Sequence, residues 1–128
     1  NNYLKNIKLD IRNLSKLKKT IKRLKPDFVF HLAAQALVKE AFLNPIKTWE
    51  TNVLGTINVL ESLKEIKKKC VVIIITSDKC YKNLEINRGY KENDILGGSD
   101  PYSASKASAE LAIKSYLESF INLKNSVI

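Results

Sequence analysis

The chain has 128 residues, of which 45% are hydrophobic, and this is enough for one globular domain with its own core. The composition excludes a collagen, a disordered chain and a disulfide scaffold. The longest uninterrupted apolar run, residues 70–75, falls far short of the roughly 20 residues that cross a bilayer. No segment resembling a signal peptide opens the chain, so a cytoplasmic protein with no membrane segment is expected.

The net charge of +9 is concentrated near the start of the chain. Nine of the 22 basic residues lie between Lys5 and Lys25, where Asp10 is the only acid. Such a stretch has two interpretations, a nucleic-acid-binding surface or the solvated face of a helix. Because no aromatic side chain is interleaved to stack on bases, the second is favoured and no nucleic-acid partner is expected.

The two cysteines, Cys70 and Cys80, flank a predicted strand. Extended chain between them would hold them roughly 30 Å apart, which is too far for a disulfide. Their spacing also matches no metal motif. Reduced thiols in a cytosolic protein, and no metal site, are therefore expected.

Hydrophobic periodicity predicts the first elements in chain order. Residues 7–11 alternate apolar and polar side chains and predict a short strand that contains Asp10. Apolar side chains recur at helical spacing over residues 14–24, and this helix is expected to end before Pro26. Residues 28–33 predict the next strand. A helix around residues 49–60 follows and is expected to end in the lysines at 67–69, whose charge suits a helix C-terminus.

The remaining elements surround a long loop. Residues 71–76 form a continuous β-branched run, apolar on both faces, which predicts a central parallel strand with helices above and below it. A polar loop containing glycines covers residues 79–100. The last helix is expected to begin with Asp100 as N-cap and Pro101 at its first position, and to continue to about Phe120.

This alternation of strands and helices predicts an α/β fold, with right-handed parallel βαβ units in a doubly wound sheet. Residues 1–128 contain no repeat and no linker, so they are taken as a single domain. Ligands of such sheets bind beyond the carboxyl ends of the strands. The polar segments expected to converge there are Asp10, residues 33–35 and residues 76–79.

Tyr102 and Lys106 are the strongest candidates for catalysis. They lie four residues apart at the start of the last helix, about one turn and roughly 6 Å along its axis, so both side chains share a face. A neighbouring ammonium stabilises a phenolate and makes a phenol a better base near neutral pH. Such a pair is able to take a proton from a substrate hydroxyl while hydride leaves the same carbon.

Other polar residues are open to more than one interpretation. Asp78 and Lys79 follow the buried strand directly, either as a solvated strand end or as an acid and base beside the Tyr102 pair. His31 on its apolar strand is interpreted as structural, and Trp49 as part of the core. Asn52 is equally consistent with a buried polar network and with a solvated position.

Two absences indicate a segment of a longer protein. The chain has no methionine, and none of its four glycines forms a glycine-rich turn between a strand and a helix. The phosphate-binding loop of a dinucleotide-binding fold would lie in a first βαβ unit that this segment lacks. The segment alone is therefore expected to be inactive.

The sequence resembles the extended short-chain dehydrogenases, the NAD-dependent epimerases and dehydratases. The matching motifs are Asp10-Ile11-Arg12, His31-Leu32-Ala33-Ala34, Thr51-Asn52-Val53-Leu54-Gly55-Thr56 and Tyr102 to Lys106. Within this family it is similar to the CDP-glucose 4,6-dehydratases, through segments 25–38, 76–81, 89–94, 96–98 and 100–106. Asp78-Lys79 is the most specific match, because the related dTDP-glucose dehydratases have Asp-Glu there.

The resemblance implies a Rossmann-like domain and an internal redox cycle on a nucleotide-activated glucose, giving a 4-keto-6-deoxy sugar. Tyr102 would deprotonate the glucose 4-hydroxyl, towards which Ser77 also aims a hydroxyl. Lys79 would assist proton removal at C5, and Asp78 would protonate the departing 6-hydroxyl. The residues that the resemblance assigns to NAD are Asp10, Ile11, Ala33, Ala34, Gln35, Asn52, Thr76, Tyr102 and Lys106.

The resemblance also implies a C-terminal substrate domain, absent from this segment, and a homodimer. Because that domain normally selects the nucleotide, CDP rests on resemblance alone. An alternative is a sugar-nucleotide 4-epimerase or reductase, which needs Tyr102 and Lys106 but no acid and base after the strand. A non-enzymatic nucleic-acid-binding domain is the least favoured hypothesis.

Overall fold

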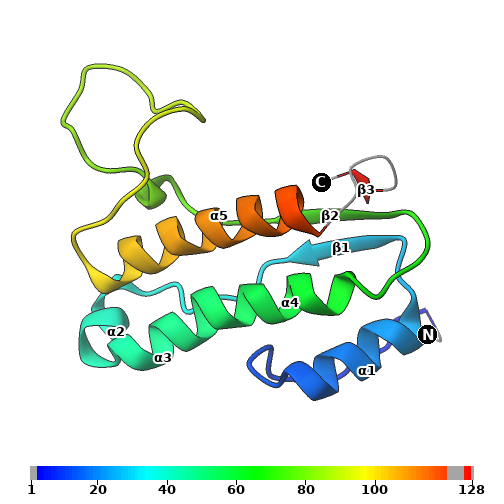
Figure 1. The fold of residues 1–128 in the computed structure, drawn as a ribbon. Coiled ribbons are helices and arrows are strands. Elements are labelled where there is room, and N and C mark those ends of the chain that lie inside the picture. The colour runs from blue at the N-terminus through cyan, green and yellow to red at the C-terminus, as the bar shows by residue number, and fades with distance from the viewer. Residues whose placement is uncertain (1–2, 121–125, 128) are drawn as a thin grey trace.

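The computed structural model describes residues 3–120 and 126–127, and it has an α/β architecture (Figure 1). The elements in chain order are α1 (Leu14–Leu24), β1 (Phe28–His31), α2 (Val38–Leu43), α3 (Pro45–Trp49), the π-helix η1 (Glu50–Leu54), α4 (Gly55–Leu63), β2 (Cys70–Ile74), the 3-10 helix η2 (Asp78–Cys80), α5 (Pro101–Ser119) and β3 (Ser126–Val127). No helix within the described ranges has both the length and the apolar run needed to cross a membrane.

The three strands form one parallel sheet in the order β1-β2-β3. Phe28 pairs with Val71 and His31 with Ile74, so the strands run in register over the whole of β1. The parallel pairing confirms the predicted α/β class, and α4 and α5 connect successive strands. Both carboxyl ends, after His31 and after Ile74, therefore open at the same edge, where polar segments follow.

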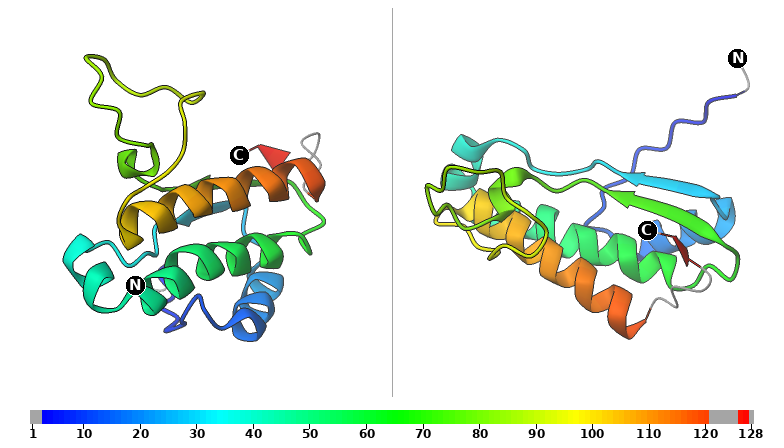
Figure 2. Two further views of the ribbon diagram at one scale, coloured as in Figure 1. Left: turned by 60° about the vertical axis from the view of Figure 1, so that its left-hand side comes forward. Right: turned by 90° about the horizontal axis from the view of Figure 1, so that it is seen from above.

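One face of the sheet carries the hydrophobic core. The core consists of Leu17, Ile21, Val59, Leu63, Cys70 and Val72, with Val29 and Ile74 packed against it. Figure 2 shows α1, α4 and α5 gathered on that side of the strands. The opposite face exposes Phe28, Phe30 and Ile73.

The prediction of helices above and below the central strand is therefore met on one face only within the described residues. The strands follow one another in spatial order, and right-handed crossovers that all step in one direction return their helices to the same side.

Three local predictions were wrong. Residues 7–11 form no strand, because the described sheet has no strand beside them and Ile11 packs on α4 instead. The helix predicted around residues 49–60 is divided by the π-helical turn η1, and it ends at Leu63, before the lysines. Trp49 is 39% exposed and so is not a core residue. The short helix α2 had no apolar stripe to predict it, since only Ala41 is buried.

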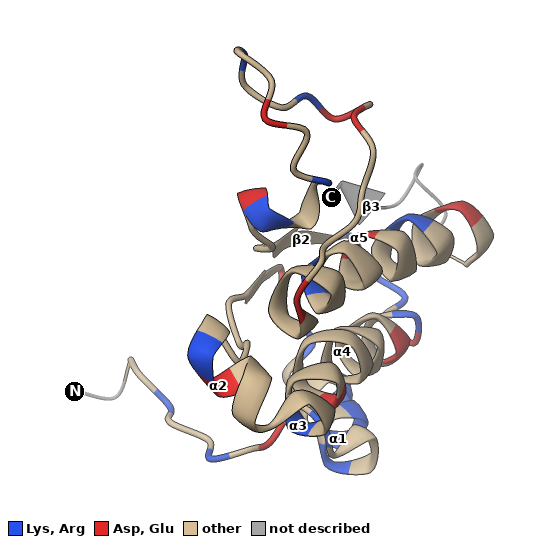
Figure 3. Cartoon of the chain, turned by 90° about the vertical axis from the view of Figure 1, so that its left-hand side faces the viewer, with Lys and Arg blue, Asp and Glu red and all other residues tan. Residues whose placement is uncertain are grey.

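The basic stretch is largely the outer face of α1. Figure 3 marks the Lys and Arg positions of α1 in blue on the ribbon. Lys18 contacts Glu61 and Glu65 at 3.2 Å each, which joins α1 to α4 and the turn that follows it. These ion pairs support the interpretation of the stretch as a helix face.

Candidate active site

The start of α5 is fixed by its capping residue. The Asp100 carboxylate accepts hydrogen bonds from Tyr102 N at 2.9 Å, Ser103 N at 3.0 Å and Ser103 Oγ at 2.6 Å. Burial alone would raise the pKa of Asp100, but these hydrogen bonds outweigh it and hold the pKa below its ordinary value. With Pro101 at the first position, the predicted N-terminus is confirmed, and it fixes the direction of the first turn, which carries Tyr102.

Tyr102 and Lys106 are both buried on α5, with exposures of 8% and 6%. Burial lowers the pKa of Lys106, while the nearby Glu110 carboxylate opposes that shift. Among the described residues, no hydrogen bond or ion pair engages the Tyr102 hydroxyl or the Lys106 ammonium. Both groups therefore have their polar atoms free for a ligand or for each other.

Asp78 and Lys79 lie on η2, which packs against α5. The Ser77 hydroxyl accepts a hydrogen bond from Lys79 N at 3.2 Å and donates one to Asp78 Oδ1 at 3.1 Å. Asp78 and Lys79 line a pocket of about 410 Å³ together with Asp100 and Ser103. The pair that follows β2 thus faces the first turn of α5, although the pocket is lined by Ser103 and not by Tyr102 itself.

The loop between η2 and α5 forms the outer wall of this pocket. The rings of Tyr81 and Tyr90 stack at 5.2 Å with an angle of 6° between them, and both residues line the pocket. Arg88 and Asp94 form two hydrogen bonds of 2.7 Å, and this pairing lowers the pKa of Asp94 to about 2. The loop is therefore tied to itself, and Figure 1 shows it projecting beyond the start of α5.

Asn52 occupies the centre of a buried polar network and is 1% exposed. It accepts a hydrogen bond from Gln35 N at 2.8 Å and donates to Gln35 O at 3.0 Å and Ser105 Oγ at 2.9 Å. Ser105 in turn donates to Tyr102 O at 2.7 Å. Of the two interpretations left open, the buried network is confirmed. Asn52 thus ties the segment of Gln35 to α5.

His31 belongs to the same network. Its Nε2 lies 3.0 Å from Thr56 Oγ1, whose own hydrogen is donated to Asn52 O at 2.7 Å. The imidazole Nε2 is therefore the donor. Burial, and then the charge of Lys106, lower the pKa of His31. The structural interpretation of this histidine agrees with its burial and fixed tautomer.

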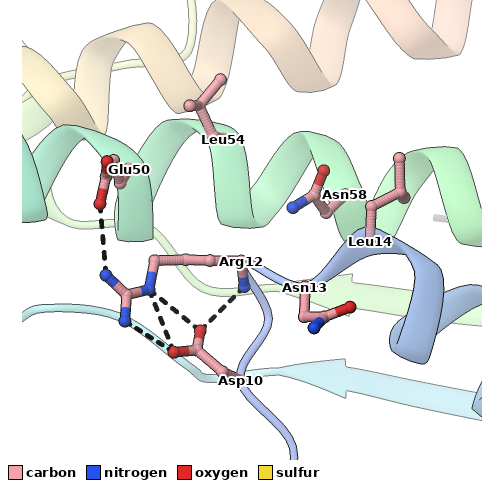
Figure 4. A pocket seen from close by; sticks show the side chains of 7 residues that line it. All are labelled: Asp10, Arg12, Asn13, Leu14, Glu50, Leu54 and Asn58. Atoms are coloured by element: carbon pink, nitrogen blue, oxygen red, sulfur yellow. Dashed lines mark hydrogen bonds and ion pairs between the residues drawn. The ribbon is translucent and has the colours of Figure 1, made fainter.

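Asp10 lies in a second pocket, of about 650 Å³, at the start of α1. Arg12 holds the Asp10 carboxylate at 2.7 Å and reaches Glu50 at 3.2 Å, as Figure 4 shows. The hydrogen bonds from Arg12 lower the pKa of Asp10 to about 2, so its carboxylate is ionised. Ile11 packs against Gly55, where an added Cβ would stand 2.5 Å from the isoleucine side chain, and this contact fixes the chain that follows Asp10.

The remaining predicted residues divide between these regions. Ala33 and Ala34 follow β1 in the segment that Asn52 anchors through Gln35. Thr76 follows β2, and its hydroxyl donates to the carboxylate of Glu110. The described pockets separate Asp10 from Asp78 and Lys79, so one crevice containing all three polar segments stays a prediction.

Sequence reasoning missed Glu110, although its position four residues beyond Lys106 places both residues on the same face of the helix. It also missed the Arg12 pairing and the Tyr81–Tyr90 stack, which depend on contacts that spacing does not encode.

Comparison with known proteins identifies the family of the chain. The family model described as GDP-mannose 4,6 dehydratase matches residues 1–126. The chain belongs to this family. It is 48% identical over 116 residues to the CDP-glucose 4,6-dehydratase of Salmonella typhimurium, a match that covers 91% of this chain and 32% of the relative.

More distant relatives extend the comparison. The chain is 39% identical over 114 residues to a Dictyostelium discoideum dTDP-D-glucose 4,6-dehydratase, which covers 81% of this chain and 26% of the relative. The structure of Thermus thermophilus UDP-glucose 4-epimerase complexed with NAD matches with a TM-score of 0.74 and 29% identity, over 88% of this chain and 36% of that one. These matches confirm the Rossmann-like fold class. The chain spans about a third or less of the length of the curated relatives it matches.

Proposed function

We propose that the protein containing this chain is an NAD-dependent sugar-nucleotide 4,6-dehydratase whose substrate is CDP-glucose. The observation that carries the proposal is the packing of η2 against α5, which turns Asp78 and Lys79 towards the helix turn that carries Tyr102. An acid and a base beside a Tyr–Lys pair suit an elimination that follows oxidation. The 48% identity to a CDP-glucose 4,6-dehydratase supports the choice of substrate.

The pocket beside Asp10 fits the adenosine half of NAD. It offers an ionised carboxylate as hydrogen-bond acceptor, the amide of Asn58 and the apolar side chain of Leu54. The polar groups suit hydrogen bonds to an adenine amino group or to ribose hydroxyls, and the leucine suits the flat face of the base. Bound NAD would accept a hydride from the sugar and later return it.

Each proton transfer of the reaction is assigned to a different side chain. The buried ammonium of Lys106 on the same helix face stabilises Tyr102 as a phenolate. This phenolate accepts the proton of the sugar 4-hydroxyl and becomes a neutral phenol. The 4-ketone makes the C5 hydrogen acidic, and Lys79, acting as a neutral amine, accepts that proton and becomes an ammonium. Asp78, in its protonated form, gives a proton to the departing 6-hydroxyl.

Solvent deuterium tests this proposal against the alternative of a 4-epimerase. In D2O, proton removal and return at C5 should leave deuterium at C5 of a 4-keto-6-deoxy product, detected by proton NMR. A 4-epimerase leaves C5 untouched. The Lys79→Ala enzyme should lose about 10²–10⁴-fold in turnover, because the positioned base is lost.

Lys82→Ala is the matched control, since Lys82 lines the same pocket and has no assigned proton transfer. Its turnover should stay within about threefold of the parent value. A product that keeps its C5 hydrogen, or a Lys79→Ala enzyme as fast as the parent, would contradict the proposal.

A further inference from the structure

Glu110 and Thr76 form a contact between the end of β2 and the middle of α5. The Thr76 hydroxyl donates a hydrogen bond to Glu110 Oε1, across 34 positions of sequence. Thr76 directly precedes Ser77, and Glu110 lies one helical turn beyond Lys106, roughly 6 Å along the axis. This contact thus joins the two segments that carry the proposed catalytic residues.

The position of Glu110 places a negative charge near Lys106 without a direct ion pair. No ion pair within 4 Å joins these two side chains among the described residues, and the carboxylate is turned towards Thr76 instead. A carboxylate held in this way stabilises a buried ammonium through space while leaving the ammonium hydrogens free for Tyr102 and a ligand.

We infer that Glu110 is a positioning residue whose charge keeps the Lys106 side chain protonated within the site. The inference rests on the proposed function in taking Lys106 to act as a cation. Burial lowers the pKa of Lys106, and Glu110 is the group that opposes the shift. Thr76 keeps the carboxylate in place, so the charge at Lys106 depends on a hydrogen bond from the end of β2.

The other titratable groups around Glu110 and Lys106 come from three elements. The first is His31 on β1, whose pKa is lowered in part by the charge of Lys106. The others are Cys80 on η2 and Tyr81 just beyond it, and the charge of Glu110 contributes to raising the pKa of each. Burial holds His31 neutral to lower pH than usual and raises the pKa of Cys80. Neither group therefore supplies an opposite charge that would replace Glu110 near neutral pH.

Glu110→Gln is the test, because glutamine keeps the acceptor for Thr76 and removes only the charge. The pKa of Lys106 should then fall further, so its ammonium loses the proton at lower pH. In the full-length protein labelled with 13C-lysine, the Cε resonance of Lys106 should titrate about one pH unit lower than in the parent. Its absence in the Lys106→Arg protein assigns the resonance.

The alkaline limb of the turnover profile should move to lower pH by the same amount. Glu110→Asp, which keeps the charge, should restore most of the parent behaviour. Glu118→Gln is the matched control, since it removes an exposed carboxylate from the same helix and should change neither profile. Superimposable Lys106 titrations in the parent and in Glu110→Gln would overturn the inference.

The two measurements also separate this inference from the proposed function. The lysine titration needs no substrate, so an inactive parent with a shifted Lys106 titration would contradict only the dehydratase assignment. An active parent whose Lys106 titration is unchanged by Glu110→Gln would contradict only the role of Glu110.

Discussion

Replacing Tyr102 with Phe should reduce turnover of the full-length protein by about 10²–10⁴-fold. The change keeps the ring and its packing on α5 but removes the hydroxyl that we propose as acceptor of the 4-hydroxyl proton. Because that hydroxyl makes no hydrogen bond to another described residue, its removal leaves no protein group without a partner. Folding and substrate binding should therefore persist, which thermal denaturation and a substrate titration will check.

Tyr116→Phe is the matched control for this prediction. Tyr116 lies on the same helix, and its hydroxyl donates to Glu61 at 3.2 Å, away from the proposed site. The control should keep turnover within about twofold of the parent and lose only a fraction of a kcal/mol in stability. A Tyr102→Phe protein with activity within a few-fold of the parent would remove Tyr102 from the mechanism.

Asn52→Leu should lower the free energy of unfolding by about 3 kcal/mol, which is several degrees in Tm. Leucine has a similar volume, but it supplies no partner for the Gln35 N–H and C=O groups. Each buried polar group left unsatisfied costs about 1–3 kcal/mol. The loss should appear in thermal denaturation of the full-length protein without any ligand.

The exposed Asn44 provides the control for Asn52. Its amide donates to Glu40 at 2.8 Å on the surface, so Asn44→Leu should change stability by no more than about 0.5 kcal/mol. If the Asn52→Leu and Asn44→Leu proteins have the same Tm, the buried network does not stabilise the fold.

The elements that the sequence predicted best are those whose signals are local. Helix α1 has an apolar stripe and a proline just beyond its end, and the N-terminus of α5 has an acidic cap followed by proline. The failed strand at residues 7–11 shows the limit of periodicity. An alternation of apolar and polar side chains is compatible with a β-strand, but a strand forms only beside another strand. The described sheet provides no neighbouring strand there.

The candidate site was predictable as far as motif spacing reaches. The spacing of Tyr102 and Lys106 predicted a shared helix face, and both prove to be buried on α5. Spacing did not show that Thr76 bonds to Glu110, or that Arg12 holds Asp10, because these contacts arise between side chains whose rotamers depend on packing. Nor did it show the π-helical turn η1, which precedes the helix α4.

The product formed by the full-length protein from CDP-, dTDP-, UDP- and GDP-activated glucose, each supplied with NAD, tests the central claim most directly. We expect CDP-glucose to be converted fastest, and to a 4-keto-6-deoxy sugar nucleotide that mass spectrometry identifies by the loss of one water. A product of unchanged mass with the configuration at C4 inverted would show an epimerase and contradict the dehydratase assignment. Faster conversion of another nucleotide would contradict the choice of CDP-glucose.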